Sequence, residues 1–240
     1  NEGFEIVRRR LFLDCKNPTA RDQVCARFSQ MYMENVGDFP YNTKEVEYRE
    51  RLVSCYPIHP EIFDRLYDDW STLENFQRTR GVLRLMAGVI HELWMSNDAS
   101  PMIMPGSIPL DTSIVREELM RYLDKDNYLG ERWSSIISNE IDGKTSVPYQ
   151  KDQSVPRYGQ KMAARRVART IMLGSAPTVR AQSVRGIEAS RIRLGVVQPG
   201  ENIADFNDAR EFVLLGADRL GTSRLVEQAK KKGGDLDAEI

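Results

Sequence analysis

Three arginines in one predicted helix have the charge and the spacing to bind a ligand: Arg78, Arg80 and Arg84. Arg80 and Arg84 are four positions apart and share one face of the helix, where like charges cost about 0.2–0.5 kcal/mol. Gly81 and Gly88 lie on an adjoining face, and an internal glycine costs about 1 kcal/mol relative to alanine. We therefore expect an interaction that offsets these costs, such as a ligand or another backbone that approaches closely at the glycines.

Surface ion pairs are an alternative explanation for the same arginines. Asp68, Asp69 and Glu74 lie in or near the preceding helix, and each could bind an arginine without any ligand. The residues alone leave both explanations open.

A second group of basic residues could bind phosphate. Nine lysines and arginines stand against one acid, Glu188, between positions 157 and 193, although the net charge of the chain is only -1. A basic face attracts the phosphates of nucleotides or nucleic acids. The expected nucleic-acid contacts are Arg165, Arg166, Arg169, Arg191 and Arg193. The alternatives are a solvated surface or a pairing with the acidic segment 111–142, which holds eight acids against four basic residues.

Two stretches resemble a phosphate loop in part. The first, DGKTS at 142–146, has Ser138 where the motif needs its first glycine, so we expect no phosphate there. The second, GADRLGTS at 216–223, has both glycines but a threonine in place of the lysine, which excludes a Walker A loop. Backbone amides and hydroxyls could still hold a phosphate there. The candidate residues are Gly221, Thr222 and Ser223, and the alternative is a plain turn before the last helix.

Histidines and cysteines predict no metal site. The three cysteines show no C-x-x-C spacing, and His59 and His91 are the only histidines. We expect both histidines to be buried, hydrogen-bonded side chains rather than catalysts. No run of about 18 apolar residues exists, which predicts no membrane span, and the cysteine usage fits a reduced cytoplasm. The chain starts without a methionine or a signal-peptide pattern, so we expect a piece of a longer protein.

The hydrophobic periodicity predicts a mainly α-helical chain. Apolar residues at helical spacing predict helices at about 19–35, 60–70, 74–94, 112–123 and from 159 onward. The helices at 60–70 and 74–94 are joined so closely that we expect them to pack as an αα-hairpin. In the helix after 159, Arg165, Arg166 and Arg169 are expected to be exposed. The alternation of Ile192, Leu194 and Val196 predicts a strand.

Five stretches in this order resemble a known family: GFEIVRRRLF, YPIHPEIFDRLYDDWSTLENFQRTRGVLRLMAGVIHELW, SPMIMPGSIPLD, AARRVARTIMLGSAP and IRLGVVQPGE. The resemblance is to the large AAA-like P-loop ATPases of phage-defence operons of the phage-growth-limitation and BREX type, and it covers about residues 1–209. It implies an internal fragment that lacks the P-loop and the Walker B strand. The implied units are the end of the ATPase core with a helical lid (1–96), a proline-punctuated connection (97–154) and a basic α+β unit similar to a winged helix (155–240).

The resemblance also implies roles for several arginines. Arg80 would occupy the sensor-2 position of the lid, where a guanidinium contacts the terminal phosphates of ATP, with Arg78 and Arg84 as further nucleotide contacts. Arg9, in the run of three arginines at 8–10, is a candidate arginine finger, and a solvated run is the alternative. ATP and Mg would be held by the missing core, so the chain alone is expected to be inactive. The implied partners are that core, nucleic acid and further copies of the chain.

The tail resembles a different family. Residues 207–233 are similar to the C-terminal phosphate loop of deoxyribose-phosphate aldolases, which are (β/α)₈ barrels. The chain has no room for eight strands arranged in that way, and no lysine in a barrel context that could form a Schiff base. A sugar-phosphate enzyme is therefore a minor alternative to the ATPase fragment, after a nucleic-acid-binding module.

Overall fold

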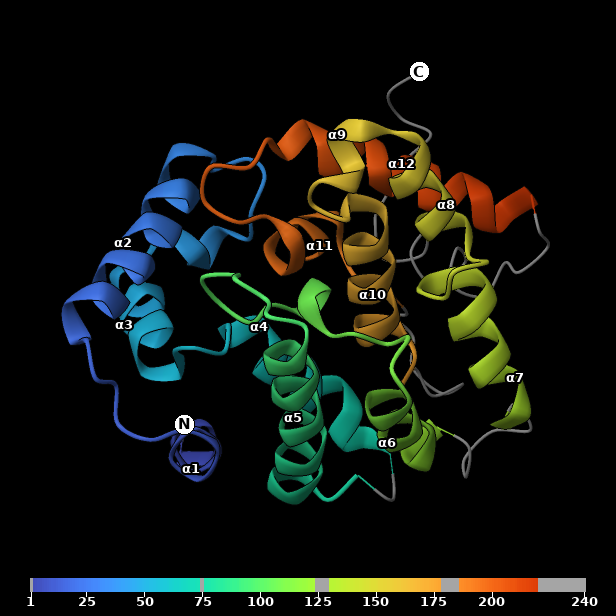
Figure 1. Cartoon of the computed structure of the whole chain (residues 1–240). Helices are drawn as coiled ribbons and strands as arrows, with labels where there is room; N and C mark the ends of the chain where they lie inside the picture. The colour runs from blue at the N-terminus through green and yellow to red at the C-terminus, as the bar shows by residue number, and fades with distance from the viewer. Residues whose placement is uncertain (1, 74–75, 124–129, 178–185, 220–240) are drawn as a thin grey trace.

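All regular secondary structure in the described part of the chain is helical. The computed structural model describes residues 2–73, 76–123, 130–177 and 186–219, and within these ranges the one strand-like contact is an isolated parallel bridge between Ile58 and Ile103. Figure 1 shows the helices running in several directions around α10. The prediction of a mainly α-helical chain is confirmed.

The described helices differ widely in length. The α-helices are α1 (Glu2–Leu11), α2 (Pro18–Glu34), α3 (Val46–Cys55), α4 (Pro60–Asp64), α5 (Arg78–Met95), α6 (Ser113–Leu123), α7 (Gly130–Ile136), α8 (Val147–Ser154), α9 (Pro156–Gly159), α10 (Ala163–Ser175), α11 (Ala189–Val196) and α12 (Ile203–Arg219). The π-helical segments are η2 (Arg65–Asp69) and η5 (Ile137–Ile141), and the 3-10 turns are η1 (Tyr41–Lys44), η3 (Trp70–Thr72) and η4 (Pro105–Ser107). None of the helices in the described ranges is long and apolar enough to cross a membrane.

Capping side chains and prolines start three of these helices. Asn17 caps α2, His59 caps α4 and Ser146 caps α8, each by accepting a backbone N–H of the first turn. Each of the three helices also has a proline in its first two positions, where the missing N–H leaves no helical hydrogen bond unmade. The sequence therefore fixes these helix starts locally.

Helix α10 lies at the centre of the fold. All of its residues except Arg165 are buried. It packs against α11, α12, α8 and η4, and its neighbours also include both π-helical segments (Figure 1). The indole N–H of Trp70, directly after η2, donates to the backbone oxygen of Leu173 in α10 over 2.8 Å. A helix covered on all sides is normally apolar all round, so the arginines of α10 need partners.

Two hydrophobic cores meet at α10. The first core includes Ile62, Leu66, Trp70, Leu85, Val89, Leu119, Ile137 and Met172. The second core includes Phe28, Tyr32, Leu52, Met104, Val167, Ile171, Ile192 and Phe206. Each core draws side chains from all three predicted units, 1–96, 97–154 and 155–240. The predicted boundaries therefore do not coincide with boundaries between cores.

The helices predicted at 60–70 and 74–94 are present, but they contact each other little. The first is α4 continued by η2, and the second is α5. Helix α5 packs mainly against α1 and α6, and its main contact with the preceding helix is with η2. The stretch that resembles an ATPase lid is thus embedded in a larger helical assembly.

The predicted strand at Ile192, Leu194 and Val196 is wrong, because these residues form α11. All three side chains are buried, and so is Gly195 between them. Helix α11 has only eight residues, and over so short a stretch a few apolar side chains fit a strand alternation as well as a helical spacing. The described part of 155–240 contains no strand, and the predicted α+β winged-helix unit is not seen there.

Candidate functional site

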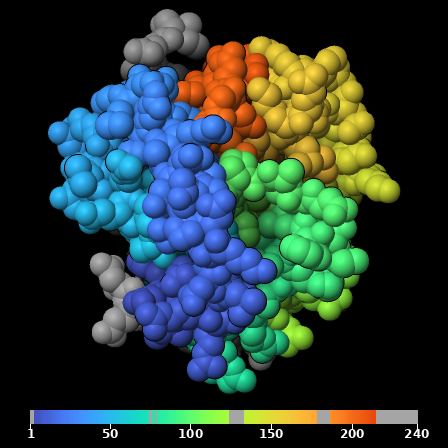
Figure 2. Space-filling view, turned by 60° about the vertical axis from the view of Figure 1, so that its left-hand side comes forward, coloured from blue at the N-terminus to red at the C-terminus, as the bar shows by residue number. Residues whose placement is uncertain are grey.

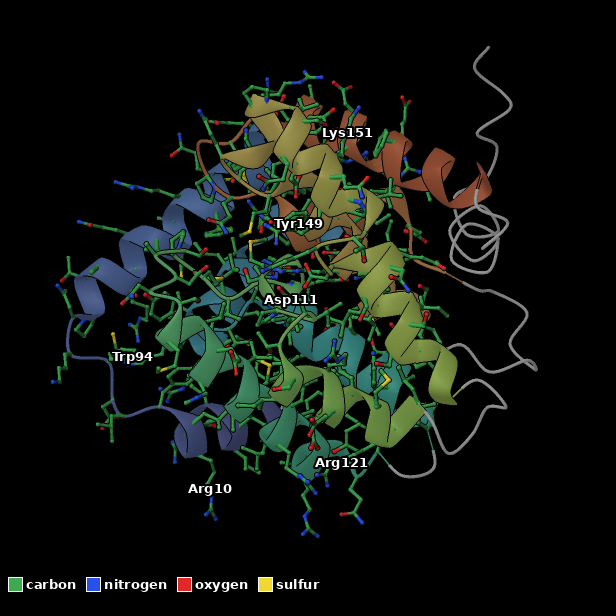
Figure 3. All side chains as sticks on the ribbon, turned by 45° about the vertical axis from the view of Figure 1, so that its right-hand side comes forward. Arg10, Trp94, Asp111, Arg121, Tyr149 and Lys151 are labelled. Atoms are coloured by element: carbon green, nitrogen blue, oxygen red, sulfur yellow. The ribbon has the colours of Figure 1, made fainter. Side chains whose placement is uncertain are left out.

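Two of the three arginines of α5, Arg80 and Arg84, lie on the surface, as their predicted role requires. Arg80 is exposed and makes no ion pair with any described residue. Arg84 binds Glu118 of α6, with 3.2 Å between its Nε and Oε1 of the carboxylate, and remains 46% exposed. Arg78 begins α5, and its side chain lies outside the described part. Figure 3 shows Arg10 and Arg121 extending outward at the end of the molecule where α5 begins.

The two glycines of α5 serve packing rather than the approach of a ligand. A Cβ at Gly81 would lie 2.9 Å from Cε2 of Phe76, and a Cβ at Gly88 would lie 3.0 Å from Cγ2 of Ile114. Both neighbours belong to this domain. Side-chain packing therefore accounts for the glycines that first suggested a ligand, whereas Arg80 itself stays without an internal partner among the described residues.

Arg9 pairs with an acid of its own helix. Its Nη2 lies 2.5 Å from Oε1 of Glu5, one turn earlier in α1, and its side chain is 69% exposed. Exposed pairs of this kind contribute little to stability. The guanidinium could leave Glu5 for another anion, so the arginine-finger hypothesis stays a prediction.

The five arginines expected to contact nucleic acid all pair with carboxylates inside the domain. The pairs are Arg165 with Asp152, Arg166 with Glu201, Arg169 with Asp142, Arg191 with Glu61 and Arg193 with Asp38. The prediction that the α10 arginines are exposed is wrong for Arg166 and Arg169, whose side chains are 7% and 5% exposed. They are buried because other helices cover every side of α10.

The acidic segment 111–142 supplies the partner of Arg169. Asp142 follows η5, is fully buried, and places Oδ1 2.7 Å from Nη2 of Arg169. Burial raises the pKa of Asp142, and the guanidinium of Arg169 opposes that rise. Asp111 lies farther from the same guanidinium, at 3.7 Å. The alternative that the basic run pairs with this acidic segment is thus confirmed at Arg169.

Glu61 is the centre of a second buried ion-pair network. Its carboxylate is fully buried and lies 2.9 Å from Arg65 and 2.9 Å from Arg191, which ties α4 and η2 to α11. Burial raises the pKa of Glu61 to about 7, and the two guanidinium groups oppose that rise. Removing one of the two arginines would leave a buried carboxylate only half compensated.

The two histidines differ in their environment. His59 is fully buried, accepts the backbone N–H of Glu61 at Nδ1 over 3.1 Å, and lies 2.9 Å from the hydroxyl of Tyr32 at Nε2. Burial lowers the pKa of His59 to about 3, so the ring is neutral at pH 7. The prediction of a buried, hydrogen-bonded histidine is confirmed for His59 and wrong for His91, which is exposed on α5.

A cavity of about 550 Å³ lies beside the buried arginines of α10. Its walls come from the end of α5, the segment 98–112, the start of α10 and the turn before α12. Figure 2 shows the green segment after α5 lying against the gold and orange segments on one face. Arg166 and Arg169 both line the cavity, and so does Met162, whose backbone is left-handed at φ 51°. Non-glycine residues in that conformation are uncommon and are enriched at functional sites.

The phosphate-loop candidates receive no structural support. Gly221, Thr222 and Ser223 lie outside the described residues. In the DGKTS stretch, Asp142 binds Arg169 and Ser146 caps α8, so both ends of the stretch have structural roles. The described residues contain no group of acids, histidines and cysteines that could hold a metal ion, and the three cysteines are unpaired thiols.

Sequence reasoning missed the acids that hold the arginines. Asp152 accepts the backbone N–H groups of Ala164 and Arg165 and so caps α10 from a distant position. Glu201 binds Arg166 through two oxygens, at 2.7 Å and 3.1 Å. The excess of acids in 111–142 was the one signal of this pairing in the sequence, and it pointed to Asp142.

The fold and these ion pairs define a mainly α-helical domain built around a buried, arginine-bearing helix. Residues 1–199 match the model of the DUF499 second domain, and the chain therefore belongs to that family. The match includes α1 to α11, both π-helical segments and most of the cavity wall. No curated protein and no solved structure matches the chain.

Proposed function

We propose that this domain is a helical regulatory part of a larger AAA-like ATPase of the phage-defence type, and that Arg80 contacts the nucleotide held by a P-loop core elsewhere in the protein. The observation that carries the proposal is the exposure of Arg80 without an internal partner among the described residues. The resemblance of the stretch 56–94 to an ATPase lid supports the same role. The proposal places the protein in the cytoplasm, where ATP is available.

The chemistry of a guanidinium suits this role. Its fixed fork donates two hydrogen bonds to phosphate oxygens, and its charge is permanent. Arg84, one turn later, is held by Glu118 and would lie at the edge of the contact. ATP and Mg would be bound by the core, so the domain would regulate hydrolysis and would not hydrolyse ATP alone. Assembly of several copies would be needed if Arg9 reaches a neighbouring nucleotide.

The test is the Arg80→Ala variant of the full-length parent protein. A lost charge-assisted hydrogen bond to phosphate lowers nucleotide affinity or turnover by about tenfold to a hundredfold. The matched control is Arg121→Ala, which removes another exposed arginine on the same side of the molecule, 59% exposed and paired with Glu118. ATP affinity is measured by titration and turnover by phosphate release. An Arg80→Ala protein that binds and hydrolyses ATP like the parent would contradict the proposal.

Nucleic-acid binding, the alternative function, would need arginines that are free to reach phosphates. The five candidates form ion pairs with carboxylates of the domain instead. We therefore expect no mobility shift of a labelled duplex at low salt, where phosphate contacts are strongest. A shift that disappears steeply with added salt would restore this alternative.

A sugar-phosphate aldolase is the minor alternative. Its candidate phosphate loop, Gly221, Thr222 and Ser223, lies outside the described residues. Borohydride trapping in the presence of an aldehyde substrate is expected to give no covalent adduct, and a trapped lysine would overturn this expectation.

A further inference from the structure

The solvent-facing side of α5 forms one continuous face along the helix. Its exposed residues are three or four positions apart: Arg80, Arg84, Ala87, His91 and Trp94. Helical residues at this spacing lie on the same side, so these five define what we call the α5 face. Figure 1 shows α5 between α1 and α6, and both helices pack against it. The α5 face thus lies between two neighbouring helices and is itself uncovered by the described residues.

The end of the α5 face carries an exposed tryptophan. Trp94 is 82% exposed, whereas Trp70 and Trp133, the other tryptophans of the chain, are buried. Met95, the next residue, is also exposed. Tryptophan is highly buried on average, and at protein interfaces it is among the residues that contribute most to binding. A partner that covers this end would remove a large apolar surface from water.

The beginning of the α5 face is basic. Arg80 makes no ion pair with a described residue. Arg84 shares the carboxylate of Glu118 with Arg121, so these three arginines keep a net positive charge. A partner that covers the whole face therefore needs an anionic group near Arg80 and an apolar surface near Trp94. At 1.5 Å per residue the two positions are about 21 Å apart along the helix.

The family and the position of α1 indicate which partner this is. The chain belongs to the DUF499 second-domain family, and a second domain follows a first domain in the same protein. The ring of Phe4 in α1 lies 4.9 Å from that of Phe63 and 5.7 Å from that of Tyr67, which fixes α1 on the domain. Because α1 also packs against α5, a domain joined to the start of α1 emerges beside the α5 face. A domain of about 100 residues has a radius of gyration of about 13 Å, so it is wide enough to span the face.

We propose that the α5 face is the surface on which the preceding domain of the same protein docks, with Trp94 buried against an apolar part of that domain. The inference goes beyond the proposed function. It predicts a contact at the opposite end of the α5 face from Arg80, and it holds whether or not the preceding domain binds ATP. In Figure 3, Trp94 lies near the edge of the molecule, apart from Arg10 and Arg121, where a neighbouring domain can reach it.

The first test compares the 240-residue chain with the full-length parent by hydroxyl-radical footprinting and mass spectrometry. Trp94 and Met95 should be oxidised about tenfold more slowly in the parent, because side chains at the centre of an interface lose contact with water. Tyr41 is the internal control, since it is 71% exposed and lies in η1, which contacts α2 and α3. Its oxidation should be equal in both proteins. Equal oxidation of Trp94 in chain and parent, both with and without ATP, would overturn the proposal.

The second test identifies the occupant with a photo-reactive benzoylphenylalanine in place of Trp94 in the parent. The cross-linked peptide should come from residues that precede this chain. A cross-link to a later part of the protein or to a second copy would overturn the proposal. So would protection of Trp94 that appears in the 240-residue chain as its concentration rises, which would assign the α5 face to self-association.

The Arg80→Ala parent separates this inference from the proposed function. If this variant hydrolyses ATP like the parent while Trp94 stays protected, the docking stands and the nucleotide contact of Arg80 fails. If the variant loses ATP turnover while Trp94 is as reactive in the parent as in the 240-residue chain, the nucleotide contact stands and the docking fails.

Discussion

Arginines occur in runs on both α5 and α10, yet the two helices use them in opposite ways. On α5, Arg80 is exposed without a partner in the described part of the chain, and Arg84 shares a surface pair with Glu118. On α10, Arg166 and Arg169 are buried and hold Glu201 and Asp142. The two helices are similar in charge but differ in their surroundings.

The difference shows that coverage by neighbouring helices decides what an arginine does. Helix α5 has α1 and α6 beside it, which leaves one side open to solvent, whereas α10 has neighbours on all sides. An arginine on an open face can meet an external anion. An arginine on a covered face must find a carboxylate inside the protein, because an unpaired buried charge is strongly destabilising.

The largest expected effect that tests this comparison is at Arg169. The Arg169→Met variant leaves the fully buried carboxylate of Asp142 without its closest cation, and we expect a loss of about 3–5 kcal/mol in the free energy of unfolding. Urea unfolding at neutral pH measures it. The double variant with Asp142→Asn removes both charges and should recover most of the loss. A loss below about 1 kcal/mol for the single variant is typical of a surface pair, and it would contradict the distinction between the α10 and α5 arginines.

A smaller effect is expected from two glycines, Gly195, which packs against α10, and Gly88, which lies in α5. In Gly195→Ala, the new Cβ would lie 2.6 Å from Cγ2 of Thr170 in α10 and 3.2 Å from Cβ of Pro105. Overpacking there should cost about 1–3 kcal/mol. The matched variant Gly88→Ala meets Cγ2 of Ile114 at 3.0 Å, but that side chain is 46% exposed and can move.

The Gly88→Ala protein should therefore be as stable as the original or up to about 1 kcal/mol more stable, because alanine favours the helix. Thermal unfolding of both variants checks the difference. Equal destabilisation by the two substitutions would show that the α5 face is as tightly packed as the α10 face.

The buried and the exposed histidine should differ in how they affect the pH dependence of stability. The folded-state pKa of His59 is lowered to about 3 from 6.5, so the unfolded chain takes up a proton first and stability is lost as pH falls from 6.5 toward 3. This residue should contribute a loss of about 1.4 kcal/mol per pH unit in that window. Unfolding of the original protein and of His59→Asn across this range isolates the effect.

The control for this experiment is His91→Gln, which removes the other histidine of the chain, an exposed residue of α5. Glu61, with its pKa raised to about 7, acts in the opposite direction, because its contribution is lost as pH rises from 4.5 to 7. It is present in all three proteins, so the difference between them reports His59. Parallel profiles for the original protein and His59→Asn would contradict the prediction.

The smallest effect is expected on α5 itself. Arg84→Ala removes a partly exposed pair with Glu118 and should cost less than about 1 kcal/mol. Arg80→Ala should leave stability unchanged, because the side chain has no partner to lose within the described residues. Chemical unfolding of both variants measures this. A loss at Arg80 as large as that at Arg169 would place Arg80 among the structural arginines and remove the basis of its proposed role.

The positions of α2, α4, α5, α6 and α10 could be predicted from the sequence, because their apolar residues recur at helical spacing, whereas α3, α7, α8 and α12 were not predicted. The stripe of Ile62, Leu66 and Trp70 is buried in the first core as expected. The same spacing misleads where the polar face of an amphipathic helix is itself buried and paired, or where a helix is only about two turns long. For this reason α11 imitated a strand, and the arginines of α10 were expected at the surface.

The candidate sites were harder to predict, because they depend on contacts between distant positions. Arg191 and Glu61 are 130 residues apart, and Arg169 contacts Gly106 across 63 residues. Local spacing carries no information about such pairs. The exposure of Arg80 could be predicted from its place on an amphipathic helix, whereas the cavity is built from four separate segments and left no pattern in the sequence.

Helix α10 contributes Ala168 and Met172 to the first core and Val167 and Ile171 to the second. Unfolding of α10 would remove buried side chains from both cores. Neither core can therefore unfold while the other remains folded. The domain should consequently unfold in a single cooperative transition. A polypeptide that ends at position 154 would lack α10. We expect it to form helices and a compact state, but not a single ordered tertiary structure.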